Sequence, residues 1–126
     1  MKALAKSLLI EFYDCNTEFL NNKEKMKAAL LESAKISGAA IIKTVFHKFN
    51  PHGISGVIVI AESHFSVHTW PEYGYCAVDM FTCSENINCD LAMDYLNKKL
   101  SAESMSIVDV KRGVLNLPPD KVKQKN

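Results

Sequence analysis

One short segment of the sequence concentrates side chains that can attack, titrate or bind a ligand. It runs from Ala61 to Tyr75 and reads A-E-S-H-F-S-V-H-T-W-P-E-Y-G-Y. Polar groups of this kind between two hydrophobic stretches are what a catalytic site on rigid elements requires. The residues concerned are Glu62, Ser63, His64, His68 and Glu72. Taken one at a time, a serine between strands is ordinarily a turn residue, and a single histidine is ordinarily a core or surface side chain, so the pattern leaves both roles open.

A metal site is the first chemistry that this segment could support, with His64 and His68 as ligands and Glu72 or Cys83 completing the set. Two residues four positions apart on a strand lie about 13 Å from each other. Zinc ligands must lie within ~2 Å of the ion, so one ion cannot bind both histidines. We expect no metal.

An acyl-transfer enzyme of the serine–histidine type is the second possibility. Ser63 does not stand in a G-x-S-x-G motif, and no glycine-rich loop prepares an oxyanion hole. No aspartate is placed to orient His68. Ordinary hydrolysis is therefore weakly supported.

Four cysteines are present, without a C-x-x-C pair among them: Cys15, Cys76, Cys83 and Cys89. Zinc fingers and thioredoxin-like redox motifs need such close pairing. We expect free thiols, and most free cysteines are small buried hydrophobic residues.

The composition indicates one globular domain. The 126 residues are 48% hydrophobic and 23% charged, and the formal net charge of +1 gives no sign of a nucleic-acid partner. The longest apolar stretches are too short to span a bilayer, and the N-terminal apolar run is followed by Glu11 and Asp14 without a signal-peptide cleavage site. We expect a cytoplasmic protein without a membrane partner.

Hydrophobic periodicity and turn signals predict six strands and two helices. The predicted strands are Ser7–Tyr13, Ile41–Phe49, Ile54–Ala61, Phe65–Trp70, Tyr75–Thr82 and Met105–Val110. The predicted helices run from an Asn22 cap to about Ser37, and over Cys89–Leu100 after an Asn88 cap. The tail from Pro118 has little to bury, and we expect it to be mobile.

Short turns between neighbouring strands imply antiparallel hairpins, and two crossover helices can cover only one face of a sheet. The expected fold class is therefore α+β, a two-layer α/β sandwich with an antiparallel sheet and two helices on one face. The other sheet face would carry apolar rows, which favours dimerisation through the sheet or its edge. Within Phe65–Trp70, alternation places three side chains on one face, Phe65, Val67 and Thr69, and three on the other, Ser66, His68 and Trp70.

Two longer segments carry a family resemblance: FHKFNPHGISGVIVI, and ESHFSVHTWPEYGYCAVDMFTC after it. Together they resemble the prokaryotic S-adenosylmethionine decarboxylase proenzyme, which is pyruvoyl-dependent. The resemblance runs from EFYDC near the start to Cys83 and fades after Arg112. The sequence departs from the family near Cys76, where we would expect alanine, and near Ser84, where we would expect glycine.

The resemblance implies that the chain makes its own cofactor. The Ser63 hydroxyl would attack the carbonyl carbon of Glu62, and the chain would separate into residues 1–62, the β chain, and 63–126, the α chain. Ser63 would become a pyruvoyl group. His68 matches the base that removes the Ser63 α-proton, and Ser55 matches a residue that assists processing by hydrogen bonding.

The resemblance also implies the reaction of the processed enzyme. The pyruvoyl ketone forms a Schiff base with the amine of S-adenosylmethionine, and carbon dioxide leaves. Cys83 matches the proton donor, Phe49 an aromatic that stacks on adenine, and Glu72 a carboxylate that binds the ribose hydroxyls. The product supplies aminopropyl groups for spermidine synthesis, and the family is a homodimer of processed protomers with its sites at the subunit interface.

Two other functions remain open from the sequence. A pyruvoyl-dependent decarboxylase acting on arginine or another amino acid would keep the same processing residues and differ only in its pocket. An unprocessed, non-enzymatic dimeric binding domain would retain the motif as turn sequence.

Overall fold

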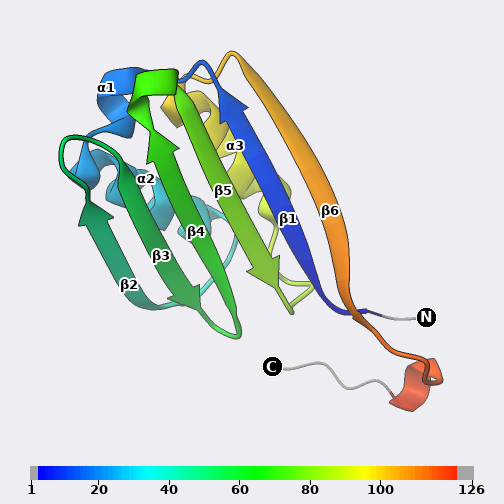
Figure 1. Ribbon diagram of the computed structural model, residues 1–126. Coiled ribbons are helices and arrows are strands. Elements are labelled where there is room, and N and C mark those ends of the chain that lie inside the picture. The colour runs from blue at the N-terminus through cyan, green and yellow to red at the C-terminus, as the bar shows by residue number, and fades with distance from the viewer. Residues whose placement is uncertain (1–2, 122–126) are drawn as a thin grey trace.

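A computed structural model describes residues 3–121 of the chain. Six strands, three helices and two 3-10 turns follow one another along it (Figure 1). In order they are β1 (Ala3–Tyr13), α1 (Thr17–Leu20), α2 (Lys23–Ile36), β2 (Ile41–Lys48), β3 (Ile54–Ile60), β4 (Ser63–Trp70), η1 (Pro71–Tyr73), β5 (Tyr75–Thr82), α3 (Cys89–Leu100), β6 (Ser104–Val114) and η2 (Pro119–Lys121).

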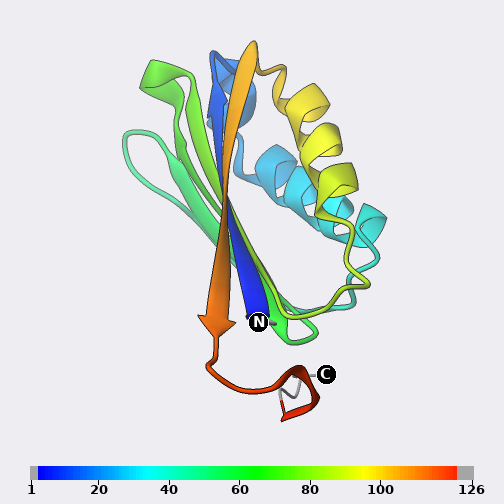
Figure 2. The ribbon, with the colours of Figure 1, turned by 90° about the vertical axis from the view of Figure 1, so that its right-hand side faces the viewer.

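The strands form one antiparallel sheet in the order β2-β3-β4-β5-β1-β6. The long helices α2 and α3 lie side by side on one face, and the opposite face carries no helix (Figure 2). This arrangement confirms the predicted α+β sandwich. Because β1 lies between β5 and β6, the first and last strands of the chain are neighbours, and the hairpin β3–β4 lies toward the other edge.

Helix positions follow from their caps. The Asn22 side chain accepts a hydrogen bond from the Lys25 backbone N–H, and the Asn88 side chain accepts one from that of Leu91. Each cap satisfies a backbone donor that a first helical turn would leave unpaired. Both helices therefore begin where the asparagines predict.

Some boundaries differ from the prediction. β1 and β6 are longer than expected because they pair with each other along most of their length, from Ala3 opposite Val114 to Tyr13 opposite Ser104. The single turn α1 was not predicted, since four residues are too few for a hydrophobic period. Of the tail from Pro118, η2 is described, and residues 122–126 lie outside the described part.

The core lies between the sheet and the two long helices. Alternate side chains of β1, β4 and β5 point into it, as the period of a strand requires. Its largest fully buried members include Phe12, Phe65, Leu30, Met80 and Leu96.

The helix-free face, which we call the open face, is partly apolar. Its exposed large side chains come from five of the six strands: Leu9, Tyr13, Val45, Val59, Trp70, Val108 and Val110. This confirms the predicted apolar rows on the open face. Within residues 3–121, no helix is both long enough and apolar enough to cross a membrane.

Candidate functional site

The Glu62–Ser63 peptide lies at the tip of the β3–β4 hairpin. Only Ala61 and Glu62 separate the two strands, since Ile60 pairs with Ser63. Glu62 has φ 61°, in the left-handed region that a residue with a Cβ rarely occupies. A non-glycine residue held there costs free energy and is often found at functional sites. The tight connection therefore places backbone strain next to the peptide bond that the resemblance identifies.

Ser63 is the first residue of β4, and not part of the preceding connection as the sequence suggested. Ser63 is 8% exposed, and its side chain faces the helix layer. The Cys83 backbone N–H donates a hydrogen bond to Ser63 Oγ at 3.1 Å. Cys83 directly follows the end of β5, so the sheet itself brings these two residues together. We call Glu62, Ser63 and Cys83 the cleavage end.

Ser55 and His68 meet on the open face at the other end of the same hairpin. They are directly paired on β3 and β4, and Ser55 Oγ lies 2.8 Å from His68 Nδ1. When Nδ1 carries the imidazole proton and donates it to Ser55, Nε2 keeps a lone pair that can accept another proton. In that tautomer the contact orients the His68 ring and leaves Nε2 as the acceptor.

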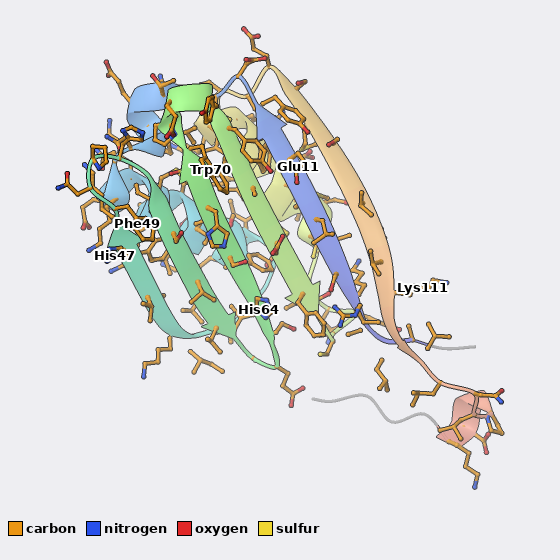
Figure 3. All side chains as sticks on the ribbon, in the orientation of Figure 1. Glu11, His47, Phe49, His64, Trp70 and Lys111 are labelled. Carbon is orange, nitrogen blue, oxygen red and sulfur yellow. The ribbon has the colours of Figure 1, made fainter. Side chains whose placement is uncertain are left out.

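A cavity of about 240 Å³ opens beside this pair. The two residues expected to bind substrate, Phe49 and Glu72, both line it, and the labels of Figure 3 place Phe49 and Trp70 toward this end of the sheet. Its full lining is Phe49, His52, Gly53, Ile54, Ser55, His68, Thr69, Trp70 and Glu72. An aromatic ring, a carboxylate and a histidine–serine pair thus share one hollow, which we call the turn-end cavity.

The two groups are separate within one chain. Ser63 and His68 are five residues apart on an extended strand, a distance of about 17 Å. Their side chains also point to opposite faces, because Ser63 follows the buried pattern of β4 and His68 the exposed one. Within one chain, Ser63 and Cys83 lie together at the cleavage end. Ser55, His68, Phe49 and Glu72 lie together at the turn-end cavity, and the two groups do not meet.

Sequence reasoning missed several residues around the turn-end cavity. His52 Nε2 lies 2.6 Å from Glu72 Oε2, and Trp70 stacks on Tyr75 at 5.2 Å. The Tyr75 hydroxyl donates a hydrogen bond to Glu11, and burial, followed by this contact, raises the pKa of Tyr75. The histidine of the N-P-H-G turn could have been considered from the sequence alone. The pairing of β1 with β5, which brings Glu11 to Tyr75, could not, because no local sequence pattern indicates which strands pair.

The four cysteines have free thiols, as predicted, and three of them are buried. Burial, with a smaller effect of Asp14, raises the pKa of Cys15 to about 11, and burial also raises the pKa values of Cys76 and Cys89. These three thiols stay protonated at neutral pH and pack as hydrophobic groups. Cys83 is the one that is half-buried, and it lines a cavity of about 260 Å³ at the cleavage end.

Across the described ranges, no group of three or more His, Cys, Asp or Glu side chains is placed to hold a metal ion. His64 instead stacks on Phe81, with the ring centroids 5.6 Å apart. This contact is an ordinary packing role for a strand histidine.

Comparison with known proteins identifies the family. The model of the S-adenosylmethionine decarboxylase family matches residues 6–113. The S-adenosylmethionine decarboxylase proenzyme of Thermoanaerobacter sp. (strain X514) is 48% identical over 118 residues, which cover 94% of this chain and 95% of that protein. That of Thermodesulfovibrio yellowstonii is 48% identical over 125 residues, covering 99% and 93%. The crystal structure of adenosylmethionine decarboxylase from Aquifex aeolicus VF5 is 28% identical and superposes with a TM-score of 0.85, covering 98% of this chain and all of that one. The chain belongs to the S-adenosylmethionine decarboxylase family.

Proposed function

We propose that this chain cleaves itself between Glu62 and Ser63 and then decarboxylates S-adenosylmethionine with the pyruvoyl group that results. Membership of the family makes the chain a decarboxylase of that substrate. The observation that carries the self-cleavage is the left-handed Glu62 beside a buried serine hydroxyl that a backbone N–H already binds. The relatives named above are proenzymes, which agrees with a processing step.

The cleavage balances with the groups present. Ser63 Oγ attacks the Glu62 carbonyl carbon, the peptide C–N bond breaks, and an ester forms while the Ser63 nitrogen becomes an amine. A base then removes the Ser63 α-proton, and those electrons form a Cα–Cβ double bond as the Glu62 carboxylate leaves from Cβ. Water hydrolyses the resulting enamine through its imine tautomer, ammonia departs, and residue 63 is left as a pyruvoyl group.

The residues at the cleavage end fit this group. A hydroxyl is required at position 63 as both nucleophile and leaving oxygen, and Ser63 supplies it. The Cys83 N–H that binds Ser63 Oγ orients the oxygen before attack. Relief of strain at Glu62 on chain cleavage favours the forward direction.

The proton acceptor comes from a second copy of the chain. His68 is the matching base, yet in its own chain it lies about 17 Å from Ser63. Two copies can stack their open faces about a twofold axis that reverses the strand direction. The turn end of one copy then lies against the cleavage end of the other, where the partner's His68 would approach the Ser63 backbone, which carries the α-proton, and not the core-facing hydroxyl. The apolar side chains of the open face support such a homodimer, since exposed apolar patches mark interfaces. The turn-end cavity of one chain, at about 240 Å³, is also below the ~300–1,000 Å³ of typical ligand sites, as expected for one wall of a shared site.

The pyruvoyl ketone supplies an electron sink for the pair released when carbon dioxide leaves. Cys83 is the proton donor, because its backbone N–H binds Ser63 Oγ, which places this half-buried residue beside position 63. Phe49 stacks on the adenine and Glu72 accepts hydrogen bonds from the ribose hydroxyls. Both line the turn-end cavity with Ser55 and His68, where the nucleoside would lie.

Release of carbon dioxide from carboxyl-labelled substrates tests this function. Purified enzyme should release labelled carbon dioxide from S-adenosylmethionine and not from arginine, because an aromatic ring and a carboxylate suit a nucleoside. The decarboxylated product would serve as aminopropyl donor for spermidine. Activity on arginine alone would overturn the substrate assignment, and inactivity of an uncleaved chain on both would point to a binding domain.

A further inference from the structure

The closest polar contact at the turn-end cavity joins two turns that are far apart in sequence. His52 Nε2 lies 2.6 Å from Glu72 Oε2, and the two side chains are 37% and 36% exposed. His52 belongs to the turn between β2 and β3, and Glu72 to η1 between β4 and β5. The contact therefore bridges the segment that carries Phe49 and the segment that carries the carboxylate.

Both segments are held by the rest of the fold. In the first turn, the Phe49 N–H donates to Gly53 O at 2.8 Å, and the Gly53 N–H donates to Asn21 Oδ1 at 3.1 Å. In the second, the Cys15 N–H donates to Gly74 O at 2.9 Å, next to η1. The backbone of each turn is thus fixed independently of His52.

The two ligand-facing groups are fixed less firmly than the backbone. Phe49 is 49% exposed, and the His47 ring meets its ring edge-on, with the ring centroids 4.6 Å apart. For Glu72, the described contact is the one to His52. A glutamate side chain loses considerable rotamer freedom when it is held in place, so a prior contact lowers the cost of ordering it for a ligand.

We infer that His52 is a positioning residue for nucleoside recognition: it holds Glu72 Oε2 and leaves Glu72 Oε1 to accept from a ribose diol beside the Phe49 ring. This inference rests on the proposed function, in which that cavity binds the nucleoside of the substrate. A neutral imidazole suffices, since its Nε2–H donates to the carboxylate. His52 does not touch the reacting atoms and takes no part in chain cleavage.

Two substitutions separate hydrogen bonding from ring packing. His52→Phe keeps a flat ring in the turn and removes the donor, whereas His52→Gln keeps an N–H donor on a side chain of different shape. Lys48→Ala, at the end of β2 and outside the cavity lining, is the matched control.

Steady-state kinetics and adenosine and adenine affinities are the measurements. In His52→Phe we expect the KM for S-adenosylmethionine to rise about two- to fivefold at nearly unchanged kcat, because a pair that is more than a third exposed has a modest energy. Adenosine affinity should fall by a similar factor and adenine affinity should not, since adenine has no diol. His52→Gln should lie close to the wild type, and Lys48→Ala should equal it.

The other possible results overturn either the role of His52 or the proposed function. Unchanged adenosine affinity in His52→Phe, or equal losses for adenosine and adenine, would overturn the role of His52, the second result indicating a general disturbance of the turn. A wild-type enzyme that binds neither ligand and releases no carbon dioxide from S-adenosylmethionine would instead overturn the proposed function.

Discussion

His68 and Cys83 occupy opposite ends of the sheet, and the proposed function gives them two different proton transfers. His68, with Ser55 bound to its Nδ1, would take a proton during maturation. Cys83, whose N–H binds Ser63 Oγ, would give a proton during turnover. Separate residues allow each step to be disabled without the other.

Substitution of these two residues should therefore give opposite defects. His68→Ala should slow chain cleavage at least a hundredfold, the typical contribution of a general base. Cys83→Ala keeps the backbone N–H and should cleave normally, yet lose carbon dioxide release by a similar factor. Time courses on denaturing gels and activity assays check both, with Cys89→Ala as a control that changes neither step. Normal turnover by fully processed Cys83→Ala would remove its assigned role.

Burial of Cys15 predicts lower stability at alkaline pH. Burial raises its pKa from 9.0 to about 11, so the unfolded chain loses this proton at lower pH than the folded one. Cys15 therefore leaves the free energy of unfolding unchanged below about pH 9. It lowers this free energy by up to roughly 3 kcal/mol as the pH rises toward 11. Urea unfolding measured at about pH 8 and about pH 10.5 should show a smaller fall in the free energy of unfolding between these pH values for Cys15→Ala than for the wild type. Equal falls in the free energy of unfolding of the two proteins would contradict this effect of Cys15. Part of the fall should remain in both proteins, because the pKa values of Cys76 and Tyr75 are raised as well.

At the scale of elements, the hairpin β2–β3 depends on one glycine. A Cβ at Gly56 would lie 2.2 Å from Phe46 Cδ2, far inside any normal contact. The Phe46 ring covers this position from the neighbouring strand, where the two residues are directly paired. Gly56, the residue after Ser55 in β3, thus leaves room for the Phe46 ring on the helix side of the sheet.

Gly56→Ala should destabilise the chain by about 1–3 kcal/mol, since the ring or the strand must move. Phe46→Ala alone should also destabilise it, through lost packing. The double variant should cost less than the sum, because the clash disappears with the ring. Chemical denaturation of the three variants measures this coupling, and strictly additive costs would show that the ring and the glycine do not interact.

The secondary structure was largely predictable because its signals are local. Asn22 and Asn88 cap their helices at the predicted residues, and β5 spans the predicted Tyr75–Thr82. The lengths of β1 and β6 were not predictable, since their ends are stabilised by pairing with each other across about a hundred residues of sequence. The resemblance identified Ser63 and His68, but their separation becomes visible only once both are placed on β4 with opposite faces.

Within residues 3–121, the proposed nucleophile Ser63 and the proposed base His68 lie in two separate groups of residues at opposite ends of the sheet. In the proposed homodimer, a twofold axis would repeat the pairing of Ser63 with the partner's His68, so that two chains would form two complete sites. The His52–Glu72 contact could not be foreseen from sequence for a similar reason, since it depends on β3 and β4 bringing two distant turns together.

Complementation between inactive variants tests the shared site. Ser63→Ala lacks the nucleophile, His68→Ala lacks the base, and neither should be processed alone. In a mixed dimer one site combines Ser63 of the His68→Ala chain with His68 of the Ser63→Ala chain. Co-expression with distinguishable tags should restore cleavage of the His68→Ala chain and of no other. Failure of cleavage in a purified mixed dimer would place the base elsewhere.

The mass of the denatured protein shows whether the Glu62–Ser63 bond converts to a pyruvoyl terminus. The wild type should give two fragments, residues 1–62 with a free carboxylate and residues 63–126 lighter by one ammonia than a chain beginning with serine. Ser63→Ala should remain whole, and Ser66→Ala, a serine of the same strand that faces away from the core, should split like the wild type. A single intact mass for the folded wild type, or a second fragment that begins with an ordinary amino-terminal serine, would contradict conversion of Ser63 to a pyruvoyl group.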